Sequence, residues 1–105
     1  MIRDKRGRDP DAGYRHERLE RVVQDELNEI LRDEVTDPSL ADVRVTHVKL
    51  SVDYRAAKVY YTCASGAAID RALAPALARA AGFMRARLAD TVELKRVPEL
   101  RFTPF

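Results

Sequence analysis

The residues best suited to chemistry in this chain are basic side chains grouped around Gly82. They are Arg71, Arg79, Arg85, Arg87, Lys95 and Arg96. A guanidinium group binds phosphate through a bidentate fork, and phosphate contacts of this kind are independent of sequence and weaken steeply as salt rises. The grouping therefore indicates phosphate binding. A solvated helix surface is the alternative that these residues alone leave open.

Residue types that support metal or nucleophilic chemistry do not gather along the chain. His16 belongs to a charged segment, His47 to a strand-like run, and Cys63 to the apolar side of another. A single cysteine excludes an intramolecular disulfide, and no run approaches the roughly 18 apolar residues of a membrane span. We therefore expect a non-catalytic cytoplasmic protein with no cofactor, no metal and no membrane partner.

Charge is distributed unevenly along the sequence. Residues 1–23 carry seven Lys or Arg against five Asp or Glu, residues 24–42 carry one base against seven acids, and residues 43–105 carry eleven bases against five acids. Such asymmetry is typical of proteins with a polyanionic partner. Arginine outnumbers lysine fifteen to four, but codon bias explains that ratio equally well.

The first half of the chain predicts an arm, a helix and a hairpin. Residues 1–13 are charged and nearly free of apolar side chains, which predicts a flexible arm preceding one domain over residues 14–105. Apolar residues at spacings of three and four predict an amphipathic helix over residues 14–35, ending before Pro38. Alternating runs over 43–52 and 57–63 predict a hairpin, and a change of phase at Thr46–His47 predicts a β-bulge.

Gly82 interrupts the helical pattern of the second half. Glycine in a helix interior costs about 1 kcal/mol relative to alanine, so it should mark a bend or a close backbone approach. Residues 69–88 are accordingly predicted to form two helices that meet at 80–82. Pro75 is expected to kink the first of them, unless that helix begins near it. A last strand is expected over Leu100–Phe102.

In this order, four short stretches carry a resemblance to a known family. They are Asp37–Pro38 with Leu40, Ala57–Tyr60, Ala80–Arg85 and Val97–Leu100. From about Arg18 to Phe102 the chain resembles ribosome-binding factor A, a family of bacterial small-subunit assembly factors. The resemblance implies an α+β, type II KH-like domain of order α-β-β-α-(kink)-α-β, with a three-stranded sheet and helices packed on one face.

The same resemblance implies binding to the small (30S) ribosomal subunit and its 16S rRNA. The family acts in late maturation and 5′-end processing, matters most in the cold, and is not catalytic. KH domains hold RNA over a Gly-x-x-Gly loop, which this family replaces with an Ala-x-Gly bend, here Ala80, Ala81 and Gly82. The residues expected to contact RNA are Arg79, Ala80, Ala81, Gly82, Arg85, Arg87, Lys95, Arg18 and Lys58.

The sequence leaves two other functions open. The acidic segment from Asp25 to Asp42 suggests a protein-interaction module that docks through the first helix, without direct RNA contact. A nuclease is a third interpretation, but it would need converging metal-binding carboxylates. Tyr60 is the one aromatic side chain expected on an open sheet face, and no aromatic stacking cluster is expected. Ribosomal proteins are further expected partners, and the protein is expected to be a monomer.

Overall fold

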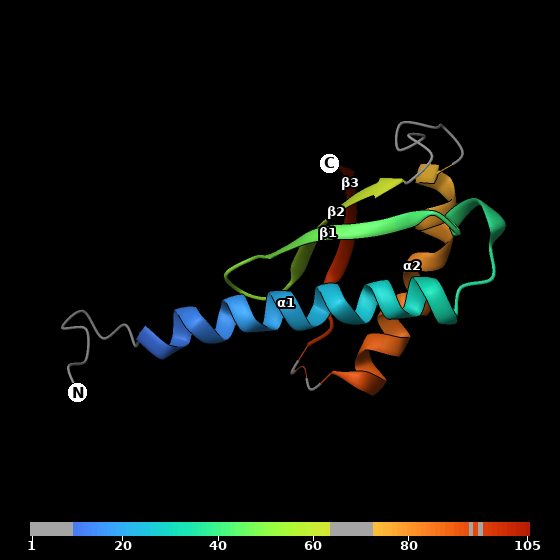
Figure 1. Ribbon diagram of the computed structural model, residues 1–105. Coiled ribbons are helices and arrows are strands. Elements are labelled where there is room, and N and C mark those ends of the chain that lie inside the picture. Colours follow the sequence, from blue (N-terminus) through green and yellow to red (C-terminus); the bar gives the residue numbers. More distant parts are fainter. Residues whose placement is uncertain (1–9, 64–72, 93, 95) are drawn as a thin grey trace.

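The computed structural model describes residues 10–63, 73–92, 94 and 96–105. Its elements are α1 (Pro10–Asp33), a 3-10 turn η1 (Pro38–Leu40), β1 (Val43–Leu50), β2 (Ala56–Cys63), α2 (Leu73–Thr91) and β3 (Glu99–Pro104). Figure 1 shows α1 as a long rod that lies beneath the sheet. The C-terminal part of α1 crosses α2. Both helices pack on the same face of the sheet, as expected.

The sheet has the order β1-β2-β3 and is mixed. β1 and β2 pair antiparallel, with a shift of register between Val45 and His47, which confirms the predicted bulge. β3 pairs parallel to β2, with Leu100 opposite Ala57. A parallel connection needs a crossover element, and α2 is the element that leads from β2 to β3.

Alternation along the strands and the apolar stripe of each helix build one core. Inward-facing residues include Val45, Val48 and Leu50 of β1, Ala57, Val59 and Tyr61 of β2, and Leu100 of β3. The helices add Val23, Leu27 and Ile30 from α1, and Leu77, Met84 and Leu88 from α2. Burial of one such aliphatic side chain contributes about 1.5–3 kcal/mol. Val22 of α1 is 44% exposed and does not join this core.

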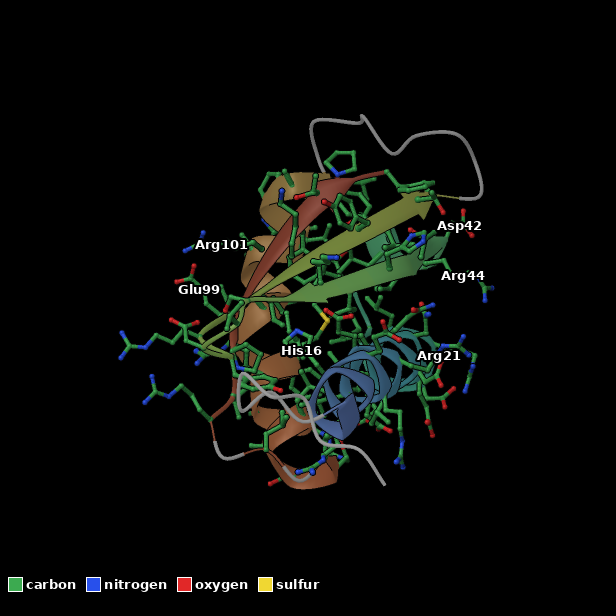
Figure 2. All side chains as sticks on the ribbon, turned by 90° about the vertical axis from the view of Figure 1, so that its left-hand side faces the viewer. His16, Arg21, Asp42, Arg44, Glu99 and Arg101 are labelled. Atoms are coloured by element: carbon green, nitrogen blue, oxygen red, sulfur yellow. The ribbon has the colours of Figure 1, made fainter. Side chains whose placement is uncertain are left out.

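The turn between β1 and β2 is fastened to α1 by a polar network. His16 lies 3.0 Å from the Tyr54 hydroxyl through Nδ1 and 3.1 Å from the Leu50 carbonyl through Nε2. The Leu50 amide donates to Glu20 Oε2 at 2.7 Å. Tyr54 has a φ of 61°, in the left-handed region, and its ring packs against His16 at 5.0 Å between centroids. Figure 2 shows His16 between α1 and the sheet.

The first helix begins and ends earlier than predicted. It starts at Pro10 rather than residue 14, so residues 10–13 belong to α1 and not to the arm. Proline is well tolerated at the first helical position, where its missing N–H has no partner to lose. The helix ends at Asp33, and the amides of Glu34 and Val35 both donate to the Ile30 carbonyl, at 2.9 and 3.0 Å. Residues 1–9 lie outside the described part of the chain.

The predicted separation into two helices at residues 80–82 is wrong, because α2 is one continuous helix from Leu73 to Thr91. Met84 and Leu88 are fully buried on the far side of Gly82. Their burial outweighs the cost of about 1 kcal/mol for an interior glycine. Pro75 is the third residue of α2 (Leu73–Thr91), in the first described turn, where proline is tolerated. Ile69 and Arg71 lie outside the described residues.

Candidate nucleic-acid interface

Gly82 lies on the exposed side of α2 and is not needed for internal packing. A Cβ atom built on it meets nothing within 4 Å. The expected close backbone approach is therefore not made within the described protein. The preceding Ala80 and Ala81 are half-buried. The result is a patch of helix surface without bulky side chains, open to whatever contacts the protein from outside.

A shallow groove lies beside this surface, between α2 and the exit of α1. Its volume is about 310 Å³. Ala76, Ala80 and Phe83 give it an apolar lining, and Phe83 is 45% exposed. Glu34 and Asp37 add acidic groups, and Arg79 contributes the cation. The groove thus combines an accessible ring with one exposed positive charge.

Arg79 is the candidate cation best placed to reach an external phosphate. Its side chain is 68% exposed, and Nη2 lies 3.5 Å from Asp37 Oδ2. Exposed ion pairs of this kind contribute about 0–1 kcal/mol, so a phosphate can compete for the guanidinium. Asp37 keeps other partners, because the amide and hydroxyl of Ser39 both donate to its Oδ1, at 3.0 and 2.6 Å. These Ser39 hydrogen bonds are the main reason that the pKa of Asp37 is lowered.

Arg85 turns toward the protein rather than away from it. Its Nε donates to the Pro98 carbonyl at 3.0 Å and its Nη2 to the Val97 carbonyl at 3.1 Å. These bonds tie α2 to the segment that leads into β3. Sequence spacing gave no sign of this role, because the two carbonyls are twelve and thirteen residues away. Arg85 is thus first a structural residue.

Arg87 is held between two carboxylates. Its Nε lies 2.6 Å from Glu34 Oε1 of the α1 exit, and its Nη1 lies 3.3 Å from Asp90 Oδ2. The Nε atom is buried without a hydrogen bond, so the Glu34 contact is ionic rather than directional. Arg87 therefore joins the two helices, and a phosphate would have to displace Glu34 or Asp90 to reach it.

The remaining predicted cations do not join Arg79. Lys58 is exposed on β2, on the sheet face opposite the helices. Arg18 is exposed on α1, fifteen residues before its end at Asp33, which is about 22 Å along a helix. Lys95 lies outside the described residues. The predicted set is therefore spread over separate surfaces.

One aromatic cluster was not predicted from the sequence. His47 and Phe105 stack on the open sheet face with centroids 5.1 Å apart, and both rings lie edge-on to Tyr60, at 6.3 and 6.2 Å. The expectation that aromatic side chains do not cluster is wrong. Tyr60 was expected on this face, but the bulge at His47 and the return of Phe105 over β1 and β2 depend on tertiary structure.

Two absences apply to the described ranges alone. Across residues 10–63, 73–92, 94 and 96–105, no three or more His, Cys, Asp and Glu side chains are grouped so that they could hold a metal ion. Over the same ranges, the helices lack the length and apolar character needed to cross a membrane.

The mixed three-stranded sheet, with both helices on one face, defines an α+β domain of the type II KH-like class. A family model described as ribosome-binding factor A matches residues 15–104. The chain belongs to the ribosome-binding factor A family.

Relatives and solved structures agree with this assignment. A ribosome-binding factor A of Vesicomyosocius okutanii is 38% identical over 91 residues, or 87% of this chain and 78% of that protein. One of Lactococcus lactis subsp. cremoris is 38% identical over 90 residues, covering 85% and 80%. The crystal structure of the Thermus thermophilus protein superposes with a TM-score of 0.76 at 30% identity, over 85% of this chain and 94% of that one. A Thermus thermophilus homology model, fitted into the map of a 30S complex, gives a TM-score of 0.70 at 30% identity and covers 85% and 93%.

Proposed function

We propose that this protein binds the small ribosomal subunit through the phosphates of its 16S rRNA, at the α2 surface around Gly82. It acts during late maturation and 5′-end processing as a cytoplasmic, monomeric and non-catalytic assembly factor, most needed in the cold. Family membership supports the partner, as does the fitting of a similar protein into a 30S complex. The main observation in favour of the α2 surface as the binding site is the open space beside Gly82.

The α2 surface at Gly82 has a feature that the fold itself does not require. A glycine that costs helix stability and leaves empty space beside it is not explained by packing. A ligand that approaches the helix backbone closely would explain it. Arg79, one turn earlier, adds an exposed cation with a weak intramolecular partner, and exposed Phe83 adds a ring next to Gly82. Arg85, Arg87, Lys95 and Arg18 stay in the proposal as secondary contacts, and Lys58 would meet RNA from the opposite face of the sheet.

Binding to purified small subunits, measured by co-sedimentation across a series of salt concentrations, tests this function. We expect affinity to fall steeply with salt, because phosphate contacts release counterions. Arg79→Gln should reduce the slope of log K against log salt by about 0.7–0.9, the value of one contact. Arg21→Gln, an equal charge change on α1, is the matched control and should leave the slope unchanged. No co-sedimentation, or a flat salt response, contradicts the proposal.

The competing function is docking of a basic protein on the acidic side of α1. Asp25, Glu29 and Asp33 are all exposed and recur every four residues, so they share one face of the helix. Within the assembly-factor proposal, this face meets a basic ribosomal protein. If it were the only docking site, replacing these three acids with Asn or Gln would abolish subunit binding, and Arg79→Gln would not weaken it.

A nuclease function is distinguished by product rather than by affinity. Incubating the protein with naked precursor rRNA and Mg²⁺ should leave the RNA intact if the protein acts by binding alone. Shortened 5′ ends that require the protein would establish catalysis and overturn this part of the proposal.

A further inference from the structure

The face of the sheet away from the helices carries a basic rung of three side chains. Lys49 of β1 pairs with Lys58 of β2, and Lys58 pairs with Arg101 of β3. Neighbouring strands lie about 4.8 Å apart, so three cations stand side by side across the whole sheet. All three residues are exposed.

Such an arrangement is unfavourable for the isolated protein. Like charges directly opposite each other on neighbouring strands are destabilising. The charge of Arg101 is partly neutralised by Glu99, which accepts a hydrogen bond from Arg101 Nε at 2.8 Å. The Lys58 ammonium lies 5.7 Å from the centre of the Tyr60 ring. Outward-facing charged residues of the three strands are Arg44, Lys49, Lys58 and Arg101 against Glu99 alone. This excess of positive charge is complementary to a polyanion.

An aromatic group lies beside the basic rung on the same face. It consists of His47, Tyr60 and Phe105, in mutual contact. Phe105 is 71% exposed, although burial of its ring would be favourable. The basic rung and the aromatic group adjoin, because Lys58 lies two residues before Tyr60 on β2 and its ammonium is 5.7 Å from the centre of the Tyr60 ring.

The chemistry that satisfies both features is that of single-stranded nucleic acid. Bases stack on exposed aromatic side chains whatever their sequence, while a positive groove follows the backbone. An acidic peptide would neutralise the basic rung but would leave the rings uncovered. A double helix keeps its bases stacked on each other, so it would also leave the rings uncovered.

We propose that the outer face of the sheet is a second RNA site, which takes a short single-stranded segment. Its bases stack on the aromatic group and its phosphates lie over the basic rung. The identity of the partner rests on the proposed function, but the site lies on the other side of the sheet from Gly82. The protein thus binds RNA on two surfaces, the α2 surface at Gly82 and the outer face of the sheet, and the two can be tested separately.

The test uses fluorescent single-stranded hexaribonucleotides, oligo(U) and oligo(A), titrated with the whole protein at several salt concentrations. Lys49→Gln with Lys58→Gln should lower the salt slope by about 1.4, since each contact to a single strand contributes about 0.7. Tyr60→Leu should weaken binding about 5- to 150-fold with the slope unchanged, the cost of one stacking interaction. Tyr60→Phe keeps the ring and should bind like the wild type. Arg21→Gln, a loss of one positive charge on α1, is the charge control. Thermal melts establish that each variant is folded.

The outcomes separate this inference from the proposed function. Loss in both sheet variants, with retention in Tyr60→Phe and Arg21→Gln, supports the second site. Wild-type affinity in both sheet variants overturns it, as does a wild-type protein that binds small subunits but no oligonucleotide. Displacement of the RNA by poly-glutamate at equal charge concentration also overturns it, because the rings would then contribute nothing. Failure of the proposed function is a different result, namely no binding of the wild type to small subunits.

Discussion

Asn28 of α1 and Val45 of β1 exchange two hydrogen bonds. The side-chain amide of Asn28 donates to the Val45 carbonyl at 2.9 Å, and the Val45 amide donates to Asn28 Oδ1 at 2.7 Å. The primary amide thus pairs with the backbone as a neighbouring strand would. β1 is an edge strand, so backbone groups on its outer side have no neighbouring strand to pair with. The Asn28 amide takes that place beside the bulge between Val45 and His47.

Asn28→Ala should therefore destabilise the fold by about 2 kcal/mol, because two partly buried backbone groups lose their partner. Urea denaturation followed by circular dichroism measures this change as a lower midpoint. Gln24→Ala, one turn earlier on α1, is the matched control and should stay within about 0.5 kcal/mol of the wild type. Equal stability of Asn28→Ala and Gln24→Ala would show that water replaces the amide at no cost.

Gly82→Ala should make the isolated protein more stable by about 1 kcal/mol. Alanine is the better helix former by that amount, and the added Cβ has open space around it. The measurement is again the free energy of unfolding from urea titration. A destabilised variant would mean that Gly82 serves the fold after all, and Gly82 would then no longer indicate an external contact.

Arg85→Gln should cost about 2 kcal/mol and loosen the start of β3, because two hydrogen bonds from a charged donor to backbone carbonyls are lost. The Glu99 amide, which donates to the Arg55 carbonyl at 2.9 Å, should then exchange with solvent faster. Arg79→Gln removes only an exposed ion pair and should change stability by less than about 1 kcal/mol. Equal effects of the two changes would contradict the different roles assigned here.

Stability should fall in acid partly through Asp37 and Asp53. Hydrogen bonds from Ser39 and from Ser51, respectively, lower the pKa of these carboxyls. A lowered folded-state pKa means that the stabilisation is fully present above the unfolded value of about 3.9 and is lost as pH falls through the folded value. Asp37→Asn should flatten the dependence of the melting temperature on pH below about pH 5. An unchanged acid limb would show that Asp37 is not held in its ionised form.

Much of the fold could be predicted from local pattern. The stripe Val23–Leu27–Ile30 predicts α1, and the phase change at Thr46–His47 predicts the bulge, because burial on one face fixes periodicity. The continuity of α2 through Gly82 could not be predicted from local pattern. Helix propensity is a weak prior, and burial of Met84 and Leu88 in the core overrides it.

The candidate site could be predicted less well. Arg79, Arg85 and Arg87 look alike in sequence, yet Arg79 makes one exposed ion pair, Arg85 donates to two backbone carbonyls and Arg87 lies between two carboxylates. These roles depend on what the fold brings opposite each side chain. The same holds for Lys49, Lys58 and Arg101, which become neighbours only through the pairing of three strands.

The central claim is that the helix surface at Gly82 contacts the small subunit, and one comparison tests it most directly. Gly82→Leu adds bulk to this surface, and its Cβ would meet no other group within 4 Å. Ala89→Leu adds the same side chain to the exposed side of α2, two turns or about 10 Å further along. With both variants folded, we predict that Gly82→Leu binds small subunits about tenfold more weakly or worse, and that Ala89→Leu binds as the wild type does. Equal, undiminished binding of Gly82→Leu would contradict the account.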